Sequence, residues 1–337
     1  MERPSEFLSE PCATTSVLLE PLLETMYAPE DLIPPEPGPV PRQWALALFL
    51  LCLTVVTTIF AGLFYATGNF GFSEPSRFIF LFLRPRVLLA GFSFSFSLTA
   101  ILLAHELGHF LACRYYGMRS TPPYFIPAPL PLTGTLGAFI KIKSAFISKR
   151  ALFDIGIAGP LAGFVFSLPV LWIGLSISRV VPKLPAHFSG LSFGEPLLFR
   201  LIAMATLGYM PDRHSLLTHP MAMAGWVGLL ATSLNLLPIW QLDGGHIAYA
   251  MFGAEQQRRL SIVLVIALIL LGLLGWPTPS YLFFGLMLLV IGWKTRFYHP
   301  APLVCEQSLG TGRTILGYVA LAILILSFTP TPITAWL

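Results

Sequence analysis

The sequence predicts an all-α, multi-pass membrane protein with about six to eight transmembrane helices and one small β element. Of its 337 residues, 55% are hydrophobic and 11% are charged, and the mean hydropathy is +0.75. Soluble domains carry about 25% charged residues. Several apolar runs reach the roughly 20 residues that a helix needs to cross a bilayer. A Pro- and Gly-rich stretch in the middle of the chain interrupts this pattern and predicts the β element.

The apolar runs set the expected organisation of the chain. Six are long enough to span a membrane, at 43–66, 87–113, 153–178, 220–242, 259–276 and 313–333, and shorter ones lie at 78–83, 197–210 and 280–293. We expect four parts: an acidic, Pro-rich, flexible cytosolic tail over 1–41, an N-terminal transmembrane region over 42–86, a core over 87–250, and C-terminal transmembrane helices over 251–337.

Charge is distributed unevenly along the chain. Residues 1–36 hold eight acids and one base, a net charge of −7, and the remaining chain has 19 bases and 8 acids, a net charge of +11. The acidic head has no basic segment followed by an apolar run, so we do not expect a cleaved signal peptide. The basic excess belongs to loops between helices, which argues against a nucleic-acid partner.

One basic loop predicts the topology. Between residues 114 and 153 there are six bases and no acid: Arg114, Arg119, Lys141, Lys143, Lys149 and Arg150. By the positive-inside rule this loop is cytosolic. The helix over 87–113 then runs inward, and parity makes the helix over 220–242 run inward as well. The polar motifs at the ends of these two helices should therefore lie at the same depth on the cytosolic side.

The first motif is "AHELGH", residues 104–109. His105 and His109 are four residues apart, so a helix projects both imidazoles from one face. This spacing matches two nitrogen ligands of a zinc ion. Glu106 lies at the flank of that face, where it can activate a metal-bound water as a general base. Ionisable residues inside a membrane are costly, which favours a functional reading.

The second motif, "NLLPIWQLDGGH" at 235–246, offers the third ligand that a catalytic zinc needs. Asp243 is the best candidate, since Gly244 and Gly245 after it let the backbone approach a metal closely. We expect Asp243 to end the apolar helix. His246 is a weaker substitute.

Together the two motifs resemble the site-2 protease family of intramembrane zinc metalloproteases, which is peptidase M50-like. "GTLGAFIKIKS" and "FDIGIAGPLAGF" resemble its bacterial and chloroplast branch. The resemblance implies one zinc ion held by His105, His109 and Asp243, with Glu106 activating the water. It also implies that Asn235 positions substrate or stabilises the intermediate. The 87–250 core is then catalytic.

The resemblance further implies a substrate and a location. The substrate would be a membrane protein whose transmembrane segment is destabilised as a helix, because a helical peptide bond hides its carbonyl. The enzyme would lie in the lipid bilayer of a bacterial inner membrane, with its active site toward the cytosol.

The stretch 120–144 is the predicted β element. Five prolines exclude a helix, and "TGTLGAFIKIK" alternates like a strand or hairpin around Gly134 and Gly137. The family resemblance implies that this element dips into the membrane. An exposed edge could pair with an extended substrate, which makes Gly134 and Gly137 candidate substrate-binding residues.

Two other function classes remain open. A non-enzymatic homologue could bind zinc or a partner without cleaving, although the presence of Glu106 argues against it. A transporter or channel could use the same ionisable residues, but it predicts symmetry-related broken helices that we do not find. Gly156, Gly159 and Gly163 are expected to form a close-packing face. The loop histidines, His187, His214, His219 and His299, are expected to lie at the surface.

Overall fold

The computed structural model describes residues 40–68, 84–183, 190–275, 280–304 and 308–336. The expected tail, all but its last two residues, and the short run 78–83 lie outside these ranges. The described helices are α2 (Pro41–Thr67), α4 (Pro85–Tyr115), α5 (Lys149–Ser176), α6 (Leu197–Leu207), α7 (Pro220–Leu236), α8 (Asp243–Phe252), α9 (Ala254–Leu274), α10 (Ser280–Lys294) and α11 (Thr311–Ser327). The described strands are β1 (Tyr124–Pro127), β2 (Thr135–Phe139), β3 (Arg179–Pro182), β4 (Gly190–Phe193), β5 (His214–Leu217) and β6 (Ile333–Trp336).

Four of these helices, α2, α4, α5 and α9, are long and apolar enough to cross a membrane. Three shorter helices, α6, α10 and α11, are also apolar. The prediction of a mainly helical protein with several candidate spans is therefore confirmed. The expected number of six to eight crossings stays a prediction.

Helix boundaries follow local chemistry. Pro41 and Pro85 occupy the first turns of α2 and α4, where a missing N–H costs no hydrogen bond. Ser148 caps α5, since its side chain accepts a hydrogen bond from the Ala151 backbone N–H. These signals set the first residues of α2, α4 and α5.

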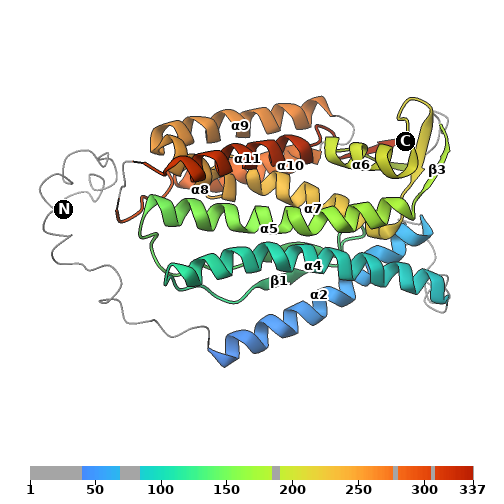
Figure 1. Ribbon diagram of the computed structural model, residues 1–337, viewed down its shortest axis with the longest axis horizontal. Helices are drawn as coiled ribbons and strands as arrows, with labels where there is room; N and C mark the ends of the chain where they lie inside the picture. Colours follow the sequence, from blue (N-terminus) through green and yellow to red (C-terminus); the bar gives the residue numbers. More distant parts are fainter. Residues whose placement is uncertain (1–39, 69–83, 184–189, 276–279, 305–307, 337) are drawn as a thin grey trace, which may run out of the picture.

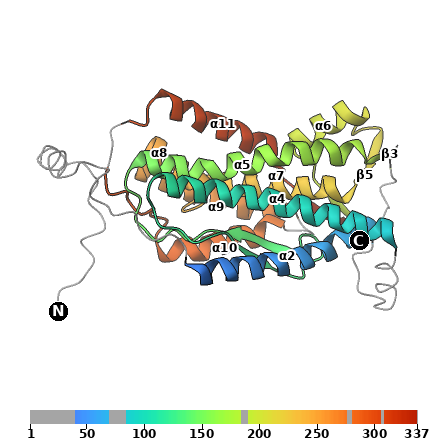
Figure 2. The same ribbon diagram turned by 60° about the horizontal axis from the view of Figure 1, so that its bottom comes forward.

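Helices α4, α5 and α7 pack on one another along their lengths, and α2 packs on α4 (Figure 1). Figure 2 shows α11 on one outer side of this group and α2 with α10 on the other. Phe94, Leu98, Leu171 and Leu229 are fully buried in the shared core. Within lipid, such association relies on close van der Waals packing. Gly108 allows it here, because a Cβ at that position would collide with the Ala158 carbonyl of α5.

The predicted β element is an antiparallel hairpin. Strand β1 pairs with β2, with Tyr124 opposite Phe139. Gly134 ends the connecting turn with a φ of +69° and lies against Thr57 of α2, where a Cβ would collide with the backbone. This close approach requires glycine.

There are two more two-stranded sheets in the described ranges, β3–β5 and β4–β6. Figure 1 shows β3 at the end of the bundle where α6 lies. The sequence analysis did not predict these sheets. Each strand has four residues, and the pairs join distant segments, such as Arg179 with Leu217. A four-residue strand with a remote partner leaves little local signal.

One predicted helix is wrong in its extent. The run 220–242 was expected to be one helix ending at Asp243, but α7 ends at Leu236 and Asp243 begins α8. Pro238 disfavours helical backbone at the residue before it, and Leu237 has a ψ of 128°. Trp240 then has a φ of +45°. The chain thus breaks and restarts directly before the aspartate.

Candidate metal centre

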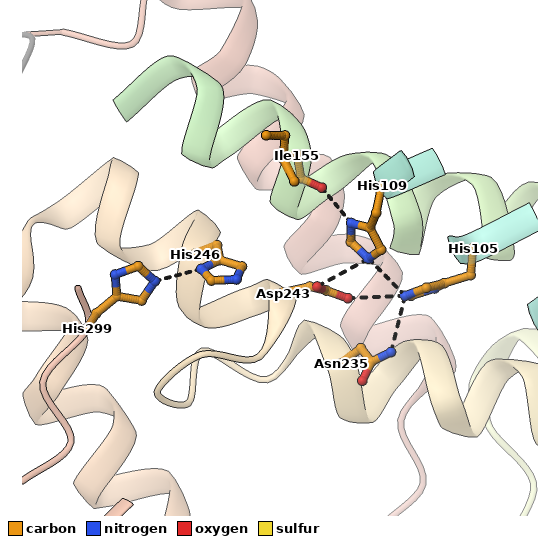
Figure 3. A network of polar contacts seen from close by, with 7 residues as sticks. All are labelled: His105, His109, Ile155, Asn235, Asp243, His246 and His299. Atoms are coloured by element: carbon orange, nitrogen blue, oxygen red, sulfur yellow. Dashed lines mark hydrogen bonds and ion pairs between the residues drawn. The ribbon is translucent and has the colours of Figure 1, made fainter. Parts of the chain in front are cut away.

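The polar residues of the first motif lie near the C-terminal end of α4, as predicted. His105, Glu106 and His109 are buried, with 6%, 6% and 7% of their surface exposed. Because of their spacing, the two imidazoles project from one face of the helix toward α5 and α8 (Figure 3). The helix places them next to each other, with ring centroids 4.9 Å apart.

Asp243 meets these histidines from the first turn of α8. Its Oδ2 atom lies 3.2 Å from Nε2 of His105, and its Oδ1 atom lies 3.3 Å from Nε2 of His109. The two Nε2 atoms are 3.1 Å apart. One ligand atom from each residue therefore falls within a group no wider than 4.8 Å. Residues that are remote in the sequence converge on one point (Figure 3).

This donor set fits a zinc ion. Ligands placed about 2.0–2.1 Å from a tetrahedral zinc are about 3.3–3.4 Å from each other, close to the distances between these atoms. Nδ1 of His109 is 2.7 Å from the carbonyl oxygen of Ile155, which can only accept a hydrogen bond. Nδ1 therefore carries the proton, and the Nε2 lone pair faces the other ligands. A second partner of this kind commonly fixes the tautomer of a metal-binding histidine.

Glu106 lies beside this group without joining it. Its buried carboxyl accepts a hydrogen bond from the backbone N–H of Ile140, directly after β2. It also interacts electrostatically with both histidines and Asp243. The hairpin that follows the motif thus holds the carboxyl next to the three ligand atoms.

Comparison with known proteins agrees with this geometry. Residues 93–274 match the model of peptidase family M50. The chain belongs to peptidase family M50. The match contains α5 and α7 as well as both motifs, so the metal centre and the helices that carry it are the part of the chain that is shared with the family.

Several plant proteins are similar to this M50 chain. The "Probable zinc metalloprotease EGY1, chloroplastic" of Oryza sativa subsp. japonica is 34% identical over 72% of the chain and 44% of that protein. The protein of the same name from Arabidopsis thaliana is 30% identical over 88% of the chain and 55% of that protein. The chain spans about half the length of these curated relatives.

The other predicted site residues of the M50 chain have different positions. Asn235 reaches the centre, with Nδ2 3.3 Å from Nε2 of His105. Gly134 and Gly137 lie in the hairpin with positive φ values and are outside the metal group. His246, the substitute ligand, is also outside it and contacts His299 instead (Figure 3). The roles of Asn235, Gly134 and Gly137 in substrate binding stay predictions.

The close-packing face predicted on α5 lies against the metal centre. A Cβ at Gly159 would collide with the imidazole of His109, and one at Gly163 would lie 3.2 Å from the His105 side chain. The α5 helix therefore presents bare backbone to both rings. This packing leaves each imidazole little freedom to leave the face of α4.

Sequence reasoning missed the residues that support Asp243. The hydroxyl of Ser261 accepts a hydrogen bond from Trp240 N–H at 2.8 Å, and Gln257 donates to the Trp240 carbonyl at 3.1 Å. Both side chains belong to α9 and are fully buried. A Gln and a Ser four residues apart in an apolar helix, "EQQRRLS", were the available signal. They hold the 237–242 segment that leads into Asp243.

A polar clamp joins three helix ends next to the centre. Arg313 of α11 makes two hydrogen bonds, of 2.8 and 2.7 Å, with the carboxylate of Asp154 in α5. Tyr116, directly after α4, donates to the same carboxylate. Burial, and then the hydrogen bond to Asp154, raise the pKa of Tyr116 to about 12. The sequence analysis did not predict these contacts of Asp154.

Proposed function

We propose that this chain is an intramembrane zinc metalloprotease that hydrolyses a peptide bond within or near a transmembrane segment of a membrane protein. The observation that carries the proposal is the convergence of His105, His109 and Asp243 beside Glu106. These residues lie in the part of the chain that matches peptidase family M50. The similar plant proteins bear the name of probable zinc metalloproteases.

Each residue has a role in the proposed reaction. His105, His109 and Asp243 hold one zinc ion, which lowers the pKa of water to about 7 and polarises a carbonyl group when bound. Glu106 accepts a proton from the attacking water and delivers it to the leaving amine. Asn235, which contacts His105, is placed to orient the substrate carbonyl. Helices α4 and α5 exclude bulk water from the ligands.

The candidate spans support a site inside or next to a bilayer. A substrate helix must unwind before its carbonyl can reach the ligands, so we expect cleavage at segments that contain Gly, Pro or Asn. An edge of the β1–β2 hairpin is the proposed surface for the unwound strand. The basic loop after α4 supports a site on the cytosolic side, or on the equivalent face of an organelle membrane. We propose residues 87–250 as the catalytic domain, because His105, Glu106, His109 and Asp243 all lie in this range.

The decisive experiment compares the purified wild type with Asp243→Ala and Glu106→Gln. We measure bound zinc by elemental analysis, and cleavage of a tagged single-span polypeptide with a central Gly-Asn-Pro segment. We expect one zinc per chain in the wild type and in Glu106→Gln, and a strong loss in Asp243→Ala. Cleavage should occur in the wild type alone.

Two results would contradict the proposal. Wild-type protein that binds no zinc after reconstitution would favour the ion-pathway class. Zinc binding without cleavage by any preparation would favour a non-enzymatic zinc protein.

A further inference from the structure

A second pair of histidines lies beside the metal centre and is not used by the proposed mechanism. His246 lies one turn after Asp243 in α8, and His299 follows α10. Nδ1 of His246 and Nε2 of His299 are 2.6 Å apart (Figure 3). His299 is only 7% exposed, so its predicted surface position is wrong. The contact with α8 explains this burial.

The hydrogen bonds of this pair define its tautomers. Nδ1 of His299 is 2.7 Å from the Pro300 carbonyl oxygen, so this nitrogen carries a proton. Nε2 of His299 then offers a lone pair, and Nδ1 of His246 donates to it. A neutral imidazole carries one N–H, and in His246 this is the Nδ1–H that donates to His299. Nε2 of His246 is therefore left as a hydrogen-bond acceptor.

The side chain that carries this acceptor lies next to the metal centre. A Cβ placed on Gly156 would be 2.8 Å from Cβ of His246 and 3.3 Å from the backbone oxygen of Asp243. The ring interacts electrostatically with Asp243 and His109. Figure 3 shows it between His299 and Asp243, with the Nε2 edge turned away from His299. Within the described ranges, no hydrogen-bond partner of this nitrogen is recorded, and the residue is partly exposed.

A loop from the C-terminal part of the chain holds the pair in place. The backbone N–H groups of Leu303 and Val304 donate to the carbonyls of Phe146 and Ile147, and the Phe146 ring packs on His246 at 5.3 Å between centroids. His299 is thereby anchored between α10 and the start of α5. The orientation of His246 does not depend on its own helix alone.

We propose that Nε2 of His246 accepts a hydrogen bond from a backbone N–H of the extended substrate beside the scissile bond, and that His299 positions the ring for this contact. This inference rests on the proposed protease function. An unwound peptide exposes N–H groups that need acceptors at membrane depth, and a neutral imidazole locked in one tautomer supplies one. No proton transfer is assigned to His246.

The test uses substitutions that separate the two nitrogens of the ring. In His246→Asn, the side-chain amide can still donate to His299 but has no atom at the Nε2 position. In His299→Gln, the amide oxygen can still accept from His246, whereas His299→Leu removes this acceptor. His214→Asn, in β5 at the other end of the helices, is the matched control. We measure zinc content, thermal unfolding, and kcat and KM for the tagged single-span polypeptide.

We expect His246→Asn to keep one zinc and an unchanged unfolding midpoint, with kcat/KM about tenfold lower, as for one lost hydrogen bond. His299→Leu should show a similar loss, which His299→Gln largely restores. Full kcat/KM in His246→Asn would overturn the inference while leaving the protease function intact. Loss of zinc or of thermal stability in His246→Asn would also overturn it, since the residue would then be structural. A wild type that cleaves nothing would overturn the proposed function and this inference with it.

Discussion

At the scale of single residues, the ligands depend on what faces them as much as on their own spacing. The four-residue spacing puts His105 and His109 on one face of α4, but α5 determines how far each ring can move. Gly159 lies directly against the His109 ring, and the Ile155 carbonyl fixes its tautomer. One helix therefore supplies both the space and the orientation for a ligand that belongs to another.

We predict that Gly159→Ala weakens zinc binding by about 10- to 100-fold, as is typical when the surroundings of a ligand change. The added methyl group would overlap the His109 imidazole and force it out of position. Zinc affinity measured by competition with a chromophoric chelator checks this. Gly312→Ala, where no atom lies within 4 Å of the new Cβ, should bind zinc normally. Equal affinity in both variants would contradict the prediction.

The sequence predicts the ligands better than their supports. The ligand residues carry local signals, namely helical spacing for His105 and His109 and a following glycine pair for Asp243. Their meeting followed from counting helix directions. Ser261 and His299 act through tertiary contacts with residues 21 and 53 positions away. The hydrophobic periodicity of a single sequence does not predict such contacts. From the sequence alone, Ser261 cannot be told from any other serine in a helix.

At the scale of elements, the break between α7 and α8 is the feature that the hydropathy pattern hides. The run 220–242 is apolar throughout, so it reads as one span, yet six residues leave the helix before Asp243. Their backbone groups need partners away from water. Two side chains of α9 supply partners for the backbone N–H and C=O of Trp240. Helix α9 thus supports the segment that leads to Asp243, although these side chains are not ligands.

We predict that Ser261→Ala lowers the free energy of unfolding by about 1–3 kcal/mol, because the Trp240 N–H would lose its acceptor in a buried place. Zinc affinity should fall with it, since the 237–242 segment positions Asp243. Denaturant titration in detergent and zinc competition measure the two effects. Ser176→Ala is the control, as this hydroxyl is exposed and bonds only within its own helix. An unchanged free energy of unfolding in Ser261→Ala would contradict the prediction.

The clamp between helix ends predicts a loss of stability at high pH. The pKa of Tyr116 is raised to about 12 in the folded protein, against about 10 in an unfolded chain. The folded state therefore binds more protons in this interval, so its stability is fully present below pH 10 and falls as the pH rises toward 12. Tyr116→Phe should flatten this part of the stability curve. Tyr115→Phe, at an exposed neighbour, should leave it unchanged.

At the scale of the whole molecule, the metal centre joins α4 and α8, which pack mainly on other helices. Helix α4 packs on α2, α5 and α7, and α8 packs on α5 and α9. A metal ion bound by His105, His109 and Asp243 links these groups directly. The general architecture was predictable from the apolar runs, because each long helix carries its own signal. The small sheets were not, because they depend on residues that only the folded chain brings together.

We predict that zinc raises the unfolding temperature and that a chelator lowers it. A ligand that binds only the folded state adds about 2.7 kcal/mol at 100 times its dissociation constant. Thermal unfolding with and without 1,10-phenanthroline measures this. Glu106→Gln should respond like the wild type, because Glu106 lies outside the group of His105, His109 and Asp243. Asp243→Ala should respond weakly or not at all, and a full response there would remove Asp243 from the ligand set.

The distance along the chain between the ligands also has a consequence for biosynthesis. Asp243 follows His109 by 134 residues, which a ribosome adds in about 7 to 27 s at about 5–20 residues per second. During that interval the nascent chain holds two histidines and a glutamate but lacks the third ligand. The helix that completes the centre enters only after the basic loop, the hairpin and α5 have been made. The order of translation therefore leaves the group of His105, His109 and Asp243 incomplete until α8 has been made.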